Sequence, residues 1–492
     1  MIVYAVDVGT TNIKVALFDE RLRRLALTQA PVTYDREGAR VEFNPQRLFD
    51  LIVELMRGCS DQYGDTARHD AVIALTGQAE SLVLRNAAGD LVRPGISWLD
   101  ARATAEAVEL AEEFGSAQAF AITGEPEASA TWPAAKLRWL ARHEPDALDQ
   151  ARAVLMVKDD IIFRLTGVKA GEVTTRGFTY LYDVPGQRYW PEMLDFCAVR
   201  AETLPMIVGA GRSVGPVVAE VIDRLPAAAS YRVNTGALDH FCAMVGTGSY
   251  AYGMASESAG TVLSLSMLAR DWTFDPARRV SFHAGLRTGE ILLFTGADSG
   301  GVVLDWFRDT ALGGMRYEEL EDLLQSRRST DAPIFLPYLT GVNPPDYSVC
   351  AKGAFLGIEL RHDQADLAHA VEEGIAHLLR RNIEYLAPDS DVTEIVSTGG
   401  GAASPYWSQL KADVCGVQVL VPREQEATCR GAAALALAEH GALGSLGDAA
   451  LLNQPEVVRY QPSKTDAAAA RYQLFETYLA RLYPGPAEGG SA

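Results

Sequence analysis

The sequence predicts an α/β protein in which helices cover β-sheets. Strand-like and helical segments alternate along the chain, which is typical of that architecture. A length of 492 residues exceeds what one hydrophobic core usually holds, and a short Gly-Thr segment recurs about half a chain after its first appearance. We therefore expect an N-terminal domain over residues 1–244, a C-terminal domain over 245–480 and a flexible tail over 481–492.

The first predicted element is a β-hairpin. Apolar residues alternate over 2–8 and 13–17, on either side of the turn 9–12, which reads Gly-Thr-Thr-Asn. The amides and hydroxyls of such a turn can form an anion-binding nest, and Gly9 lets the backbone approach a ligand. Asp7 beside a phosphate cradle makes sense when a divalent cation lies between them. An ordinary edge hairpin would explain the same residues.

Strand and helix patterns alternate after this hairpin. Residues 47–57 have a helical pattern, residues 70–76 form a short apolar run that ends at Gly77, and residues 101–114 are helical again.

The Gly-Thr repeat lies at Gly260 and Thr261, between two short alternating runs. Two related domains, each offering such a hairpin to one phosphate chain, would explain the duplication. Gly-Thr pairs also recur by chance, so the repeat alone indicates little. The Gly-Thr-Gly run 246–248 is a natural place for a domain boundary.

A glycine-rich turn follows another predicted strand. The β-branched run 394–398 leads into glycines at 399–401, and Ser404 is a good N-cap with Pro405 at the first helical position. The helix is expected to end at Gly416. A nucleotide can approach the backbone closely at such a turn, although close helix–sheet packing without a ligand is the alternative.

Composition excludes several function classes. The net charge of −20 argues against nucleic acid or an anionic membrane as a partner. The six cysteines lie far apart without a Cys-x-x-Cys pair, which favours free thiols in a reducing cytosol over a zinc site. The N-terminus lacks the pattern of a signal peptide, and no apolar stretch reaches the length of a membrane span. We expect a cytoplasmic protein.

Segments along nearly the whole chain resemble, in the expected order, the FGGY carbohydrate kinases of the actin-like ATPase superfamily. This resemblance implies two actin-like (ribonuclease H-like) domains, with mixed sheets flanked by helices and an active-site cleft between them. It also implies a homodimer, since relatives are often dimers. The matching segments are residues 7–14, 77–78 with 94–102, 158–167, 236–248 and 399–413.

The resemblance implies transfer of the ATP γ-phosphoryl group to a hydroxyl of a sugar or polyol. Asp239 would be the general base, and Asp7 would help to hold Mg²⁺ through water. From the residues alone, Asp239 is equally explained as the N-cap of a following helix. The implied ATP-binding residues are Gly9, Thr10, Thr11, Asn12, Lys14, Gly260, Thr261, Gly300, Gly400, Gly401 and Ala402.

The implied substrate-binding residues give mixed signals about the acceptor. Glu80 falls where glycerol kinases carry a substrate-binding glutamate, but Ala79 replaces their arginine. The segments 98–102 and 131–137 look more like xylulokinases, which favours a ketopentose such as xylulose. The alternatives are a glycerol or tetritol kinase, and an actin-like ATPase without a sugar acceptor. The substrate-binding residues implied by the resemblance are Gln78, Glu80, Trp98 and Asp239.

Overall fold

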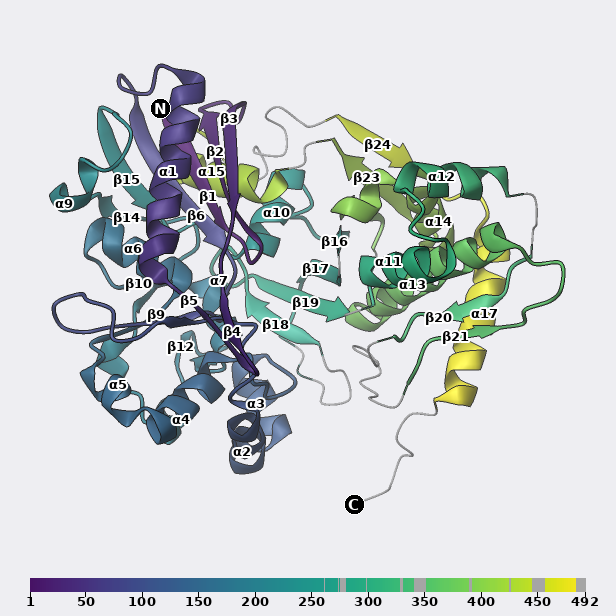
Figure 1. The fold of residues 1–492 in the computed structure, drawn as a ribbon, viewed down its shortest axis with the longest axis horizontal. Helices are drawn as coiled ribbons and strands as arrows, with labels where there is room; N and C mark the ends of the chain where they lie inside the picture. The colour runs from purple at the N-terminus through teal and green to yellow at the C-terminus, as the bar shows by residue number, and fades with distance from the viewer. Residues whose placement is uncertain are drawn as a thin grey trace.

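A computed structural model describes residues 1–260, 262–272, 274, 280–297, 299–327, 331–339, 351–388, 392–423, 426–444 and 456–483. Thr261 and the end of the predicted tail, 484–492, lie outside these ranges. The described chain forms two sheets flanked by helices, with a smaller sheet beside the first (Figure 1). None of the helices in these ranges combines the length and the apolar character needed to cross a membrane.

The first sheet contains the predicted N-terminal hairpin. Its strand order is β14 (Ser213–Pro216), β15 (Ser230–Asn234), β6 (Asp70–Gly77), β1 (Ile2–Val8), β2 (Asn12–Asp19) and β3 (Arg24–Pro31). β1 pairs antiparallel with β2 and parallel with β6. Alternate residues of β1 pack on opposite faces, so that α1 (Pro45–Tyr63) covers one face while α10 (Asp239–Thr247) and α15 (Ala427–Glu439) cover the other.

The second sheet repeats this arrangement. Its order is β18 (Ser281–Ala284), β19 (Ile291–Ala297), β17 (Leu263–Ala269), β16 (Met254–Ala259), β22 (Glu394–Thr398), β23 (Gln418–Pro422) and β24 (Val457–Tyr460). β16 pairs antiparallel with β17 and parallel with β22, as β1 does with β2 and β6. The recurrence of Gly-Thr in the sequence thus marks two hairpins in equivalent positions of two related sheets.

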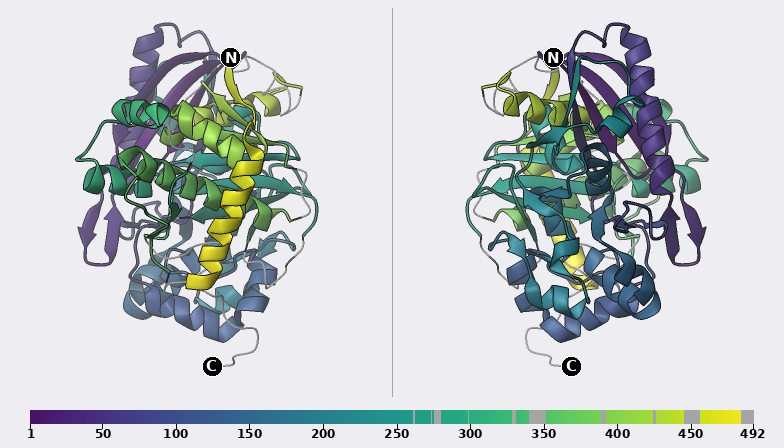
Figure 2. Two further views of the ribbon diagram at one scale, coloured as in Figure 1. Left: turned by 90° about the vertical axis from the view of Figure 1, so that its right-hand side faces the viewer. Right: turned by 90° about the vertical axis from the view of Figure 1, so that its left-hand side faces the viewer.

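Helices pack against the second sheet and support the glycine-rich turn. α13 (Gln364–Leu386), α14 (Pro405–Cys415) and α17 (Thr465–Leu482) contribute to one apolar core with its strands. α17 lies on the outer side of this domain, beside α14 and α13 (Figure 2). The remaining elements of this half are α11 (Gly301–Ala311), α12 (Tyr317–Ser326), β20 (Ile334–Leu336), β21 (Ala354–Leu356) and η3 (Gly400–Ala403).

The smaller sheet extends the N-terminal half. Its order is β4 (Asp35–Glu37), β5 (Arg40–Phe43), β8 (Gly95–Ile96), β7 (Leu82–Arg85) and β9 (Ala153–Met156), and helices α2 to α5 pack around a separate apolar core beside it. The other elements of this half are α2 (Thr104–Phe114), α3 (Ser116–Thr123), α4 (Pro133–His143), α5 (Pro145–Gln150), α6 (Val157–Thr166), β10 (Ala170–Glu172), α7 (Val173–Arg176), η1 (Gly177–Thr179), β11 (Tyr182–Asp183), β12 (Arg188–Tyr189), α8 (Pro191–Phe196), η2 (Ala201–Thr203), β13 (Met206–Val208) and α9 (Ala219–Ile222).

Two helices extend across boundaries that the sequence predicted. The Gly-Thr-Gly run that suggested a boundary near residue 245 is the end of α10: Gly246 is buried within the helix, and Gly248 closes it in the left-handed conformation. The predicted division after residue 244 falls within this helix, and the position of the domain boundary stays a prediction. At the C-terminus, α17 continues to Leu482, past the predicted start of the tail at 481.

Candidate active site

The turn between β1 and β2 lies at the edge of the first sheet. Gly9 is required there, because a Cβ at this position would lie 2.6 Å from the carbonyl oxygen of Asn12. Thr11 is exposed at the tip of the turn, and the carbonyl oxygen of Thr10 accepts a hydrogen bond from Tyr34 Oη at 3.0 Å. Asn12 is the first residue of β2. The tip of the turn is thus held from one side and open on the other, as the predicted phosphate cradle requires.

Asp7 is suited to a cation. Its Oδ1 is buried and has no hydrogen-bond partner within the described ranges. The pKa of Asp7 is raised to about 7, mainly by burial and also by the nearby charge of Asp239, while Lys14 opposes the shift. The carboxylate oxygens of Asp7 fit Mg²⁺, because this ion is commonly held by one or two carboxylates together with water and substrate phosphates. The described chain holds no cluster of three or more His, Cys, Asp or Glu side chains that would form an all-protein metal cage.

Asp239 is the first residue of α10, but it does not cap the helix. The N-cap is Leu238, and no side-chain capping bond forms there. The Oδ1 of Asp239 accepts a hydrogen bond from the amide of His240 at 2.7 Å, and His240 Nε2 lies 4.0 Å away. The carboxylate is about one-third exposed. This geometry disfavours the N-cap interpretation and leaves a partly exposed carboxylate available to a substrate hydroxyl.

Lys14 forms an ion pair across the fold. Its Nζ donates hydrogen bonds to Glu426 Oε2 at 2.9 Å and Oε1 at 3.2 Å. These contacts join β2 to the residue that precedes α15. Lys14 was predicted to bind ATP, and the structure shows its ammonium group paired with Glu426.

Gln78 and Trp98 connect the sugar side to the phosphate turn. Gln78 Nε2 donates to the carbonyl oxygen of Gly9 at 3.4 Å, and Gln78 Oε1 accepts from Ser81 Oγ at 2.8 Å. Trp98 Nε1 donates to Thr10 Oγ1 at 2.9 Å. Both predicted substrate residues therefore use polar atoms within the protein, where they position the turn.

Glu80 combines an unusual backbone with a free carboxylate. Its φ is 68°, a left-handed conformation that is rare for a residue other than glycine, asparagine or aspartate. Lys136 Nζ, which is buried, donates to the carbonyl oxygens of Glu80 at 3.4 Å and Thr131 at 2.6 Å. Burial raises the pKa of Glu80, and the charge of Asp239 adds to the shift while Lys136 opposes it. Since strained backbone concentrates at functional sites, this geometry supports Glu80 as a substrate residue.

Glu125 is a site-adjacent carboxyl group that the sequence did not indicate. It is 2% exposed, and its Oε2 accepts a hydrogen bond from Ser281 Oγ of β18 at 2.8 Å. Burial raises the pKa of Glu125 to about 8, and the charge of Glu80 contributes to the shift. His283 Nε2 lies 3.5 Å from Glu125 Oε1. No local motif surrounds Glu125, so only the tertiary contact with β18 reveals it.

A cavity of about 640 Å³ lies in the second domain, next to the glycine-rich turn. Gly260, Gly400 and Gly401 line it, as predicted for nucleotide contacts. Gly300 precedes α11, whose first residue Gly301 lines the cavity and donates its amide to the Gly260 carbonyl at 2.8 Å. Two other predicted ATP residues are not placed on its wall: Ala402 is buried without lining the cavity, and Thr261 lies outside the described residues.

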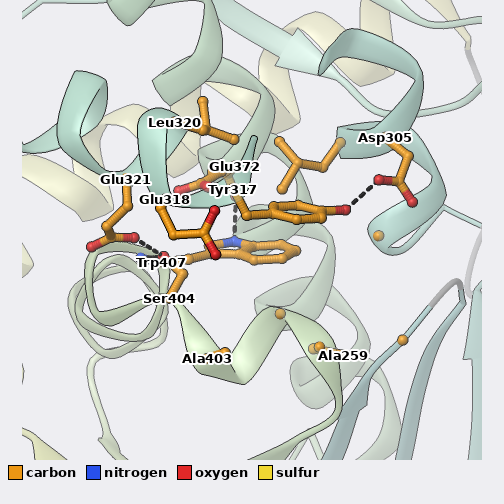
Figure 3. Close-up of a pocket in the computed structure, with 15 residues that line it drawn as sticks. Ala259, Asp305, Tyr317, Glu318, Leu320, Glu321, Glu372, Ala403, Ser404 and Trp407 are labelled. Carbon is orange, nitrogen blue, oxygen red and sulfur yellow. Dashed lines mark hydrogen bonds between the residues drawn. The ribbon is translucent and has the colours of Figure 1, made fainter. Parts of the chain in front are cut away.

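Among the described residues, four carboxyl side chains and no lysine or arginine line this cavity (Figure 3). Glu321 accepts hydrogen bonds from Ser404 Oγ at 2.6 Å and from the amide of Tyr406 at 3.0 Å. Tyr317 Oη donates to Asp305. The described residues that line it are Ala259, Gly260, Gly301, Leu304, Asp305, Tyr317, Glu318, Leu320, Glu321, Glu372, Gly400, Gly401, Ala403, Ser404 and Trp407.

Models of the two domains of one protein family match this chain. Residues 2–246 match the N-terminal domain of the FGGY family of carbohydrate kinases, and residues 255–440 match its C-terminal domain. The chain belongs to this family. It is therefore a carbohydrate kinase, a phosphotransferase that uses ATP and an alcohol group as acceptor.

Known relatives span almost the full length of the chain. It is similar to a xylulose kinase of Bacillus subtilis (strain 168), with 25% identity over 97% of this chain and 95% of that protein. It is also similar to a glycerol kinase of Leptothrix cholodnii, with 29% identity over 92% of this chain and 93% of that protein. A crystal structure of ligand-bound xylulose kinase from Lactobacillus acidophilus superposes with a TM-score of 0.89 at 24% identity, covering 98% of both chains. The predicted two-domain actin-like fold is confirmed.

Proposed function

We propose that this kinase phosphorylates a ketopentose such as xylulose and uses Asp239 as the general base. The observation that carries the proposal is the position of Asp239: a partly exposed carboxylate at the start of α10, electrostatically coupled to both Asp7 and Glu80. A general base must lie within hydrogen-bond reach of the hydroxyl that it deprotonates, and the rest of phosphoryl transfer depends on positioning and charge. Several similar proteins are named xylulose kinase.

Asp7 is proposed to hold Mg²⁺, which bridges the phosphates of ATP in this class of reaction. Support comes from the buried Oδ1 without a partner and from the adjacent turn 9–12. Mg²⁺ bound there would supply positive charge that neutralises the phosphates. The chain itself contributes the carboxylate and the backbone amides of the turn.

The cavity beside η3 is proposed to take the nucleoside part of ATP. Its acidic wall would repel phosphates, so electrostatics favours the base and ribose inside, with the phosphates directed toward the two hairpin turns. Gly400 offers a direct test because a Cβ there meets nothing within 4 Å, so a side chain can be attached without a clash at its first atom. Gly400→Leu should weaken ATP binding without loss of stability, and unchanged ATP affinity would contradict this placement.

The acceptor is tested by ADP release with Mg-ATP against ketoses, aldoses and polyols, including glycerol. Stimulation by a ketopentose is expected. Asp239→Asn should abolish this phosphorylation while ADP still binds, and an active Asp239→Asn variant would contradict the role of the base. Hydrolysis that no acceptor stimulates would instead support an ATPase.

A glycerol or tetritol kinase is the second candidate. Glu80 favours it, because its carboxylate has no hydrogen bond to the described residues and can accept hydrogen bonds from two neighbouring hydroxyls. The similarity to a glycerol kinase of Leptothrix cholodnii also supports it. Ala79 opposes it, since this position is buried and apolar where the glycerol kinases carry an arginine. The same acceptor panel separates the two candidates.

A cytoplasmic location and a homodimer stay predictions. The location is supported by the use of ATP and by the five described cysteines, all of which are free thiols. The dimer rests on family resemblance, and sedimentation equilibrium would measure it.

A further inference from the structure

Glu372 is a buried carboxyl group on the wall of the cavity beside η3. It lies in the middle of α13 and is 1% exposed. Its Oε2 is buried and has no hydrogen-bond partner in the part of the chain that the structure describes. Because a buried polar atom without a partner is costly, such an atom at a cavity wall suggests that a ligand supplies the missing hydrogen bond.

The surroundings of Glu372 favour its protonated form. The pKa of Glu372 is raised to about 8, mainly by burial and also by the charge of Glu321 on α12, while Lys411 on α14 opposes the shift. Lys411 is itself ion-paired with Glu257 at 2.6 Å. Other titratable groups on the neighbouring elements include Asp305 on α11, Tyr317 and Glu318 on α12, Tyr406 on α14, and His369 and Glu373 on α13. Glu373 is ion-paired with Arg471 of α17.

A protonated carboxyl presents one donor and one acceptor side by side. The side-chain amide of glutamine presents the same pair, and it recognises adenine through the ring nitrogen N7 and the amino group N6. Trp407 Nε1 donates a hydrogen bond to the backbone carbonyl oxygen of Glu372 at 3.1 Å (Figure 3). This contact joins α14 to α13 beside the carboxyl group. The backbone of Glu372 is therefore anchored at the cavity wall, and its protonated carboxyl group can offer a donor–acceptor pair.

We propose that Glu372 recognises the nucleobase. Its carboxyl O–H donates a hydrogen bond to a ring nitrogen of bound adenine, and its carbonyl oxygen accepts a hydrogen bond from the amino group. This inference rests on the proposed function of the cavity as the nucleoside site. No covalent bond changes, and the proton stays on Glu372. Binding of the base is then linked to protonation, since the ionised carboxylate has no proton to donate.

The linkage is measurable with ADP as the probe. Isothermal titration calorimetry of the full chain from pH 7.5 to 9.5 covers a range in which the ADP phosphates remain ionised, because phosphate groups titrate near pH 6. Glu372→Gln keeps the donor and the acceptor but cannot lose a proton. Asp322→Asn is the matched control, since Asp322 is an exposed acid of α12 that does not line the cavity.

Wild-type affinity for ADP should fall by about tenfold or more over this range as Glu372 ionises. Glu372→Gln should vary less than about twofold and stay within about threefold of the wild type at pH 7.5, while Asp322→Asn follows the wild type. Glu372→Met, which has neither donor nor acceptor, should bind ADP about tenfold more weakly at pH 7.5.

Two results would overturn the inference alone: the same pH dependence in Glu372→Gln as in the wild type, or unchanged ADP affinity in Glu372→Met. Failure of the nucleoside site itself has a different signature. In that case ADP binds equally well to Gly400→Leu and the wild type, or binds to neither, and the inference falls together with the proposed site.

Discussion

Gly431 of α15 meets the backbone of Cys242 in α10 so closely that a Cβ at residue 431 would lie 1.8 Å from the Cys242 carbonyl oxygen. The contact is reciprocal, because a Cβ at Gly246 would lie 1.9 Å from the Ala427 carbonyl oxygen. Two glycines thus let these helices cross in direct backbone contact. α10 begins at Asp239, so this crossing fixes the helix that carries the proposed base.

Gly431→Ala should therefore destabilise the protein and reduce activity. The methyl group forces the helices apart, and overpacking of this kind costs about 1–3 kcal/mol or more. Gly296→Ala in β19 is the control, because a Cβ there meets nothing within 4 Å. Chemical denaturation should show a lower free energy of unfolding for Gly431→Ala and little change for Gly296→Ala. Equal stability of the two variants would contradict the crossing geometry.

Glu125 should make stability depend on pH. Its pKa is raised to about 8 in the folded protein, whereas an unfolded glutamate titrates near pH 4.3. The folded state therefore holds a proton that the unfolded state releases, so the free energy of unfolding falls as the pH rises from about 4.3 to 8. Each unit of pKa separation corresponds to about 1.4 kcal/mol.

Glu125→Gln removes this titration and keeps an acceptor for Ser281 Oγ. The variant should gain stability relative to the wild type as the pH rises from 5 to 8, when urea unfolding is compared at both values. Ser281→Ala is a useful companion, since it removes the hydrogen bond but leaves the carboxyl group. A stability difference between Glu125→Gln and the wild type that is constant across this range would show that Glu125 does not titrate as described.

The sequence predicted the elements whose signals are local. The strand 394–398 is β22, the residues 47–57 lie within α1, and Ser404 caps α14 through a hydrogen bond to the amide of Trp407 at 3.0 Å. Periodicity and capping residues act within a few positions of the chain, so they are visible without the fold. β22 and α14 flank the glycine-rich turn of the site.

The remaining features depend on contacts between distant parts of the chain. The Gly-Thr-Gly run near 245 lies at the end of a helix because Gly246 serves a crossing with α15, whereas its local pattern suggests a linker. Glu125 depends on Ser281, and Lys14 depends on Glu426, more than 400 positions away. The left-handed backbone of Glu80 is likewise unreadable from its sequence neighbours.

Asp7→Asn should weaken Mg²⁺ binding while it increases the stability of the metal-free protein. The amide removes the negative charge proposed for Mg²⁺, so the Mg²⁺ concentration for half-maximal activity should rise about tenfold or more. Without Mg²⁺ the variant should be more stable than the wild type at pH 8, because it relieves the repulsion between Asp7 and Asp239 and the burial of a charged group. Unchanged Mg²⁺ dependence with normal activity would remove Asp7 from the metal site.

Glu80→Gly should stabilise the protein while impairing it as an enzyme. Glycine adopts a φ of 68° without strain, and a non-glycine residue in a sparsely populated region costs about 1–3 kcal/mol. The gain is reduced by about 0.5–1 kcal/mol, because glycine loses more backbone entropy on folding. Loss of the carboxylate should lower kcat/KM for the acceptor while the KM for ATP changes little, since Glu80 does not line the cavity beside η3.

Glu80→Gln is the control. It keeps the strained backbone and the side-chain length, so it should lower kcat/KM without the gain in melting temperature that strain relief gives. If Glu80→Gly and Glu80→Gln shift the melting temperature equally, the strain is not stored in the backbone of residue 80.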